Sequence, residues 1–302
     1  MRYRYFTADV FTHARFGGNQ LAVLPDARGL TGEQMLAVTR EFNYSESVFV
    51  LPPEDPAHTR RLRIFTPGAE VPFAGHPTVG TAHVLAAAGE VPLAGEHTTV
   101  VFEEGVGPVR VAIRAEGGAP VFCQLSVARL PEVGPPPPPL AVVAEALSLD
   151  VDDLVGGAMG PEAVSCGLPF LFVPLRSREA VARARVRHEP WERALKGGWS
   201  SEIMVFALDD AAPDRVRARV FVPGLSVPED PATGSACAAL GGYLAARAPA
   251  DRDGTLRWRV DQGLEMGRPS RLDVEVDRRG GAVTAVRVGG ASVLVCEGTI
   301  EI

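Results

Sequence analysis

RIFTPGAEVP at residues 63–72 and RVFVPGLSVP at residues 219–228 are two versions of one segment. Arg, Phe, Pro, Gly, Val and Pro recur at matching positions. Upstream, at the same offset, Ser45-Glu46 matches Ser201-Glu202. Downstream, HPTVGTA (76–82) matches DPATGSA (230–236), and GGNQLAVL (17–24) matches CGLPFLFV (166–173) at a looser spacing. Four matches in one order predict an internal duplication.

Each half has the same order of predicted elements. A strand is followed by an amphipathic helix, at 31–42 in the first half and about 140–154 in the second. Short β-rich segments, a Gly/Pro turn and a helix of small apolar residues come next, the helix at about 77–88 and 231–246. Apolar composition on all sides is typical of a helix buried inside a sheet, and the alternating strands favour antiparallel or mixed sheets. We therefore predict an α+β fold with two duplicated domains.

Composition excludes several classes of function. The 302 residues are 46% apolar and 22% charged, and the net charge of −7 gives no basic surface for nucleic acid. No apolar run is long enough to cross a bilayer and no signal-peptide pattern opens the chain, so we expect a cytoplasmic protein without a membrane partner. Four widely spaced cysteines in apolar settings predict buried, reduced thiols: Cys123, Cys166, Cys237 and Cys296.

The two predicted buried helices begin with similar sequences. Asp230-Pro231 predicts an N-cap followed by Pro at the first helical position, and His76-Pro77 has the same form. Small residues follow in both, namely Thr78, Gly80 and Thr81 in the first and Thr233, Gly234 and Ser235 in the second. Such helix starts favour an anion, which predicts binding of a substrate carboxylate. The alternatives are a simple cap at Asp230 and a buried, hydrogen-bonded histidine at His76.

Glu46 is the candidate acid–base group. It lies in NYSESVFVL (43–51), where a helix ends and an apolar strand begins. Partial burial there would raise the pKa of the carboxyl group toward that of a useful general base. The residues alone favour the plainer interpretation, a solvated loop carboxylate, because the matching Glu202 can be a remnant of duplication.

Motifs for other chemistry are missing from the sequence. It contains no GxGxxG after a strand, no GxxxxGK[ST], no HExxH and no GxSxG. We therefore expect neither a nucleotide nor a metal site.

With these motifs in place, the chain resembles the PhzF-like family, which is named for a phenazine-biosynthesis isomerase and is related in fold to diaminopimelate epimerase. The resemblance covers nearly the whole chain. It is carried by DVF (9–11), GGNQLAVL, NYSESVFVL, RIFTPGAEVPFAGHPTVGTA (63–82), GLPFLFVPL (167–175), DPATGSA and QGLEMGRPS (262–270).

The resemblance implies two similar domains, each a mixed β-sheet curled around a central apolar helix, with the active site in the cleft between them. We predict domains at 1–120 plus about 290–302, and at 121–289. The resemblance further implies a homodimer, no metal and no organic cofactor. Glu46 is the expected proton shuttle, with His76 and Asp230 as its catalytic partners. Four residues are expected to bind substrate: Gly75, Thr78, Gly234 and Ser235.

The predicted function is a cofactor-independent isomerase that shuttles a proton on a small carboxylate-bearing molecule. One alternative is an epimerase or racemase of an amino or hydroxy acid. Related enzymes of that kind place a cysteine on each side of the substrate, but Gly75 and Ser235 stand at those positions, and we expect Cys237 to lie in the core. The other alternative is a catalytically silent ligand-binding protein.

Overall fold

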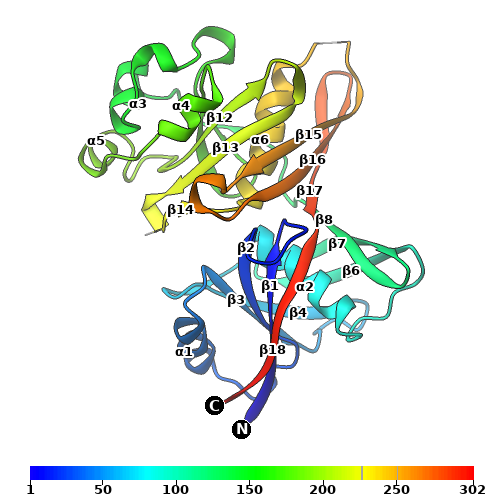
Figure 1. The fold of residues 1–302 in the computed structure, drawn as a ribbon. Coiled ribbons are helices and arrows are strands. Elements are labelled where there is room, and N and C mark those ends of the chain that lie inside the picture. Colours follow the sequence, from blue (N-terminus) through cyan, green and yellow to red (C-terminus); the bar gives the residue numbers. More distant parts are fainter. Residues whose placement is uncertain (226, 250) are drawn as a thin grey trace. The chain divides into compact units, whose positions relative to one another are not determined.

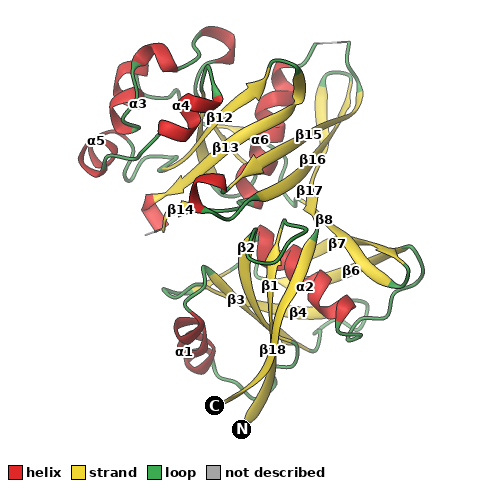
Figure 2. Cartoon of the chain, in the orientation of Figure 1, coloured by secondary structure: helices red, strands yellow, loops and turns green. Residues whose placement is uncertain are grey.

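The computed structural model describes residues 1–225, 227–249 and 251–302, so Ser226 of the second repeated segment lies outside the described residues. The chain divides into two compact units. Unit 1 is Met1–Ala128 with Gly289–Ile302, and unit 2 is Arg129–Val288. Figure 1 colours the chain along its sequence, and Figure 2 shows that both units mix strands with a few helices. The fold is of the α+β class.

Unit 1 is a mixed sheet packed on one buried helix, α2 (Gly75–Ala87). Its strands are β1 (Arg2–Val10), β2 (Asn19–Leu24), β3 (Glu46–Leu51), β4 (Arg60–Phe65), β5 (Glu70–Val71), β6 (His97–Glu104), β7 (Gly107–Glu116), β8 (Ala119–Ser126) and β18 (Ser292–Glu301). Strands β2 and β3 pair in parallel, as do β4 and β6. The remaining pairs, β18–β1, β1–β2, β3–β4, β4–β5, β6–β7 and β7–β8, are antiparallel. The last strand of the chain thus returns to the first, a question that the sequence leaves open.

Small residues allow α2 to lie within its sheet. A Cβ atom added at Gly80 would come within 2.5 Å of Val10 and 2.6 Å of Leu21. Contacts that short require one of the neighbours to move, so glycine is needed here for close packing. On the outside of the sheet lies α1 (Gly32–Phe42), close to the predicted helix at 31–42, and it begins with a capping box at Thr31.

Unit 2 repeats these pairings. Its strands are β9 (Glu132–Val133), β10 (Glu162–Ser165), β11 (Pro169–Pro174), β12 (Glu202–Asp209), β13 (Ala212–Val222), β14 (Val227–Asp230), β15 (Gly254–Gln262), β16 (Ser270–Arg279) and β17 (Ala282–Gly290). Strands β11 and β12 are parallel, as are β13 and β15, while β12–β13, β13–β14 and β15–β16 are antiparallel. Helix α6 (Gly234–Arg247) packs against β10, β11, β15 and β16. Both buried helices are therefore surrounded by strands in the same connection order.

Three short helices cover the outer side of the unit 2 sheet, and two of them were not predicted. They are α3 (Leu140–Ala146), α4 (Arg178–Arg183) and α5 (His188–Ala194). The prediction of one helix over 140–154 was wrong, because Ser148 adopts a left-handed φ of 58° and the N–H of Leu149 bonds back to Ala144 O. This 6→1 bond ends the helix.

The structure corrects the prediction that all four cysteines are buried. Cys123 and Cys237 are buried, but Cys166 is partly exposed and Cys296 is exposed. Cys296 lies in β18, where side chains alternate in direction, so its apolar sequence neighbours do not cover it. Within the described ranges, none of the helices has both the length and the apolar character to span a membrane.

Candidate active site

Glu46 opens strand β3 and faces the start of α2. Its Oε2 atom lies 3.5 Å from Nε2 of His76. The Glu46 side chain is 19% exposed and that of His76 is 6% exposed. The plainer sequence interpretation, a solvated loop carboxylate, therefore does not describe Glu46.

A short chain of polar groups fixes the ring of His76. Ser45 Oγ donates to Oδ1 of Asn19 at 3.2 Å, which leaves the Asn19 amide nitrogen to face Nδ1 of His76, also at 3.2 Å. An amide nitrogen is a donor only, so Nδ1 accepts and the proton of the neutral ring lies on Nε2, toward Glu46. The sequence singled out Glu46 and His76 and left open whether Asn19, which begins β2, has a structural role or contacts ligand.

Burial changes the chemistry of the Glu46 carboxyl group. Loss of water on burial raises the pKa of Glu46. A carboxyl group with a raised pKa is a better base when ionised and is more readily protonated near neutral pH. Glu46 can therefore accept and return a proton, which is the role that the resemblance implies.

Thr78 in the first turn of α2 contacts a carboxyl group that the sequence analysis missed. Thr78 Oγ1 lies 2.8 Å from Ala74 O and 2.7 Å from Oε1 of Glu104. A hydroxyl has one hydrogen to donate, so if Thr78 bonds to Ala74 as helical threonines do, Glu104 must be the donor in the second bond. Burial raises the pKa of Glu104 to about 8, in keeping with a protonated acid. The sequence signal for its burial was the alternation in β6, where Glu104 falls on the same buried face as Val100 and Phe102.

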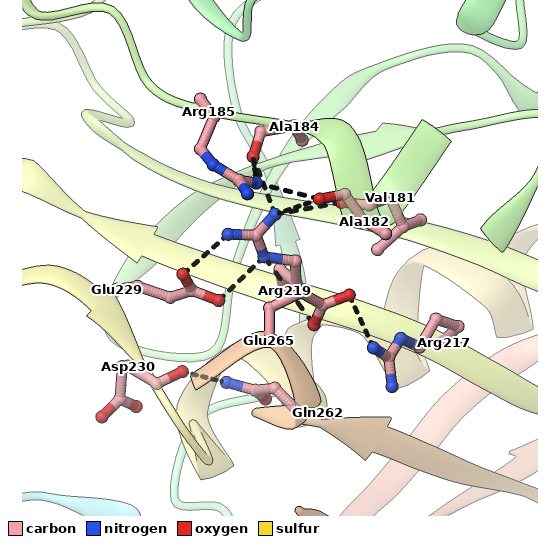
Figure 3. Close-up of polar contacts among 10 residues, drawn as sticks. All are labelled: Val181, Ala182, Ala184, Arg185, Arg217, Arg219, Glu229, Asp230, Gln262 and Glu265. Atoms are coloured by element: carbon pink, nitrogen blue, oxygen red, sulfur yellow. Dashed lines mark hydrogen bonds and ion pairs between the residues drawn. The ribbon is translucent and has the colours of Figure 1, made fainter. Parts of the chain in front are cut away.

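In unit 2, Asp230 lies at the end of β14, four residues before the first residue of α6. Nε2 of Gln262 donates to Asp230 O at 2.7 Å (Figure 3). The same Nε2 donates to Thr233 Oγ1 at 3.0 Å, and Thr233 Oγ1 donates to Oδ2 of Asp230. The prediction that Asp230 caps the helix was wrong. Asp230 ends β14, paired with Val220, so its backbone stays extended and α6 begins four residues later with Thr233 as its N-cap. In unit 1, His76 likewise lies within the first turn of α2 and Ala74 is the N-cap.

A buried ion pair, Arg219 with Glu229, holds strand β14, which ends at Asp230. The Arg219 side chain, 3% exposed, makes two bonds of 2.8 Å to Glu229. The same guanidinium donates to three carbonyl oxygens at the end of α4, those of Val181, Ala182 and Ala184 (Figure 3). Bonds on both sides of Arg219 thus tie β14 to α4 one residue before Asp230.

Glu202 of unit 2 corresponds to Glu46 but makes a different contact. Its Oε2 accepts the backbone N–H of Gly224 at 3.3 Å. Glu202 is 5% exposed, and burial raises the pKa of its carboxyl group to about 7. Unlike Glu46, this glutamate bonds to the backbone of its own hairpin.

The remaining expected site residues lie at the two helix starts. Gly75 and Gly234 are the first residues of α2 and α6, and both are buried, while Ser235 is partly exposed. A search of the residues that the structure describes finds no group of three or more His, Cys, Asp or Glu side chains that could hold a metal ion.

Comparison with known proteins identifies relatives of this chain and of its fold. Residues 8–298 match the family model described as phenazine biosynthesis-like protein. An uncharacterized isomerase of Mesorhizobium japonicum is 40% identical, covering 99% of this chain and 98% of the relative. The trans-2,3-dihydro-3-hydroxyanthranilate isomerase of Pseudomonas aeruginosa is 34% identical, covering 98% of each chain. The crystal structure of a PhzF-family phenazine biosynthesis protein of Bacillus anthracis superposes with a TM-score of 0.89 at 25% identity and covers 100% of both chains.

The fold and these relatives define the class of protein as an isomerase. Within that class, the chain belongs to the phenazine biosynthesis-like, or PhzF, family.

Proposed function

We propose that this isomerase moves a double bond in a small, conjugated carboxylate by transferring one proton, with Glu46 as the shuttle. One observation carries the proposal. Glu46 is a largely buried carboxyl group with a raised pKa, and it lies 3.5 Å from a histidine nitrogen whose ring is fixed from its other side by Asn19. A single group of this kind can act as base and then as acid.

The proposed reaction balances without a co-reactant. The Glu46 carboxylate removes a proton from a carbon next to the conjugated system, and the electron pair of that C–H bond moves into the system. The protonated Glu46 then returns the same proton to a different carbon, so the substrate is isomerised and the enzyme is regenerated. The Nε2–H group of His76 lies where it can donate to the charge that develops during transfer.

The start of each central helix, α2 in unit 1 and α6 in unit 2, has the features of a site for a carboxylate. Neither N-cap residue, Ala74 or Thr233, caps its helix with a side-chain hydrogen bond. The positive end of a helix dipole favours an anion, and glycine at the first helical position lets it approach the backbone. The proposed binding residues are Gly75, Thr78, Gly234 and Ser235, with Asp230 as a polar partner that orients the substrate.

We also propose that the two units descend from one duplicated unit, as the repeated segments predict. Corresponding residues of β3–β4 and β12–β13 pair in the same register, with Ser47 opposite Phe65 in unit 1 and Ile203 opposite Phe221 in unit 2. The hairpins that follow differ in register, with Ile64 opposite Val71 but Val222 opposite Val227. The parallel pairs Arg61–Glu103 and Arg217–Asp261 correspond in the same way.

The names of the relatives suggest the first substrate to test. Three relatives from Pseudomonas species are named trans-2,3-dihydro-3-hydroxyanthranilate isomerases. That molecule is a conjugated cyclic carboxylate, which is the class that the proposed site would accept. A panel of related unsaturated carboxylates would extend the test.

The deciding experiment is NMR of this panel in deuterated water with the wild type and Glu46→Gln. Glutamine has the shape of glutamate but cannot accept the proton, so we expect turnover to fall by about 10²–10⁴-fold with the fold intact. Wild-type turnover by Glu46→Gln would overturn the proposal. Inversion at one carbon, in place of a double-bond shift, would instead assign an epimerase.

Glu202→Gln is the matched control. The glutamine oxygen can still accept the N–H of Gly224, so this variant should keep both fold and turnover. Equal loss in the two variants would mean that the glutamates serve the structure and not the proton transfer.

A further inference from the structure

Two hairpin turns in corresponding positions satisfy their backbone N–H groups differently. In unit 1, Phe65 at the end of β4 pairs with Ser47. In unit 2, Phe221 pairs with Ile203 in the same register. The next three residues are Thr-Pro-Gly at 66–68 and Val-Pro-Gly at 222–224.

In unit 1 the turn is closed by its own threonine. Thr66 Oγ1 accepts hydrogen bonds from the N–H groups of Gly68 at 3.3 Å and Ala69 at 3.1 Å. The same hydroxyl donates to Ala69 O at 3.0 Å. These bonds form a compact side-chain turn that needs no other residue.

In unit 2 the hydroxyl is missing and a glutamate replaces it. Val222 stands in the place of Thr66, and the N–H of Gly224 is accepted by Glu202. Glu202 directly precedes Ile203, just as Glu46 directly precedes Ser47. The carboxylate of Glu46 could therefore reach the N–H of Gly68 in the conformation that Glu202 adopts.

We infer that Thr66 is a positioning residue for Glu46: its hydroxyl takes the N–H groups of the turn and so leaves the Glu46 carboxylate at His76. The inference rests on the proposed function, because it explains how the proposed shuttle is kept available. In unit 1 the carboxylate is 3.5 Å from His76, whereas its counterpart in unit 2 is bound to the turn.

Water does not make the Thr66 hydroxyl redundant. Gly224 is exposed to solvent, and its N–H is nevertheless held by Glu202. Gly68 is equally exposed, so removal of the hydroxyl should leave its N–H able to attract Glu46 in the same way. A hydrogen bond to a carboxylate is stronger than one between neutral groups, which favours that exchange.

The test is the steady-state kinetics of Thr66→Val, which gives unit 1 the residue found in unit 2. We expect kcat to fall about tenfold with little change in KM, because a backbone N–H bound to Glu46 makes it a weaker base. The same bond lowers the pKa of Glu46, so the acid limb of the pH–rate profile should move to lower pH. Thr66→Ser keeps the hydroxyl and should restore both quantities.

Thr98→Val is the control for general damage to a turn. Thr98 Oγ1 accepts the N–H of Ala94 at 2.8 Å in an exposed turn of the same unit. This variant should lose a similar amount of stability but keep the kcat and pH profile of the wild type. If Thr66→Val does not fold, Thr66→Ala removes the same hydroxyl and is measured by the same two readouts.

The outcomes separate this inference from the proposed function. If Glu46→Gln is inactive while Thr66→Val has the wild-type kcat and pH profile, the inference is overturned and the proposed function stands. If Glu46→Gln is active, both are overturned. A fall in kcat that Thr66→Ser does not restore would also overturn the inference.

Discussion

The two units pair their strands in the same order but have different side chains at the start of the central helix. The first turn of α2 in unit 1 contains a buried histidine, His76, and beside it lie a largely buried glutamate, Glu46, and a second buried acid, Glu104. Beside α6 in unit 2, an amide, Gln262, stands at the end of β15, just as Glu104 ends β6. The glutamate that corresponds to Glu46 is bound to a turn.

The difference shows how the same arrangement of strands can hold a glutamate in two ways. Near α2 the Glu46 carboxylate lies beside a histidine, whereas in unit 2 the Glu202 carboxylate is hydrogen-bonded to a backbone N–H. In unit 2 the Asp230 carboxylate accepts from Thr233 and its carbonyl accepts from Gln262, which suits an orienting role. In unit 1 a threonine performs the task of Glu202, and the carboxylate remains beside a histidine. Exchanging residues between corresponding positions is therefore the sharpest way to test the comparison.

The largest stability difference should separate the two corresponding arginines, Arg63 and Arg219. Arg219 is 3% exposed. Arg219→Met therefore leaves Glu229 and three carbonyl oxygens at the end of α4 without their hydrogen-bond donor. We expect the free energy of unfolding to fall by about 3–5 kcal/mol. Arg63 is 24% exposed and pairs with Glu70, which is 43% exposed, so Arg63→Met should cost about 1 kcal/mol or less. Urea denaturation measures both. Equal losses would show that burial does not distinguish the two pairs.

Much of unit 1 could be predicted from the sequence because the signals were local. The helix at 31–42 has a capping box, and helix α2 has small or apolar residues on all sides. Glu46 and His76 were singled out from sequence, but their 3.5 Å contact depends on the register of β3 beside the start of α2. That register is a tertiary property, which explains why the residues alone favoured a solvated Glu46.

Backbone geometry overrode a strong local sequence signal at two places. Asp-Pro at 230–231 predicts an N-cap, yet pairing with Val220 keeps Asp230 in a strand. A helix of fifteen or so residues from 140 was equally well patterned, but Ser148 adopts a left-handed conformation and ends it early. The role of Glu104 was missed because its partner, Thr78, lies far away in the sequence.

Exchange of Glu104 and Gln262 should give the next largest effect, and it should depend on pH. Glu104 has an ordinary pKa of 4.5 when unfolded and about 8 when folded. Between these values the folded state holds a proton that the unfolded state releases, so the free energy of unfolding falls as pH rises from about 4.5 to about 8. Glu104→Gln keeps a donor for Thr78 and removes this fall. We expect a gain that grows over this range to a few kcal/mol at pH 8.

Gln262→Glu is the reciprocal change. It places a carboxyl group where an amide now donates to Asp230 O and Thr233 Oγ1. This variant should lose stability as pH rises, in the direction opposite to Glu104→Gln. Urea denaturation at pH 5, 6.5 and 8 measures both variants against the wild type. A Glu104→Gln gain that does not change with pH would mean that Glu104 is not protonated in the folded protein.

The smallest effect should come from the two turn glycines, and it addresses the contact that distinguishes Glu202 from Glu46. A Cβ atom at Gly224 would overlap Oε1 of Glu202, whereas one at Gly68 has Thr66 Oγ1 at an ordinary 3.7 Å. Gly224→Ala should therefore displace the carboxylate and cost about 1–2 kcal/mol, the cost of leaving a buried polar group without its partner. Gly68→Ala should change stability by no more than about 0.5 kcal/mol. Neither glycine has a left-handed φ, so backbone strain does not enter the comparison. If the two alanine variants unfold at the same urea concentration, Glu202 does not hold its turn, and the contrast with Thr66 fails.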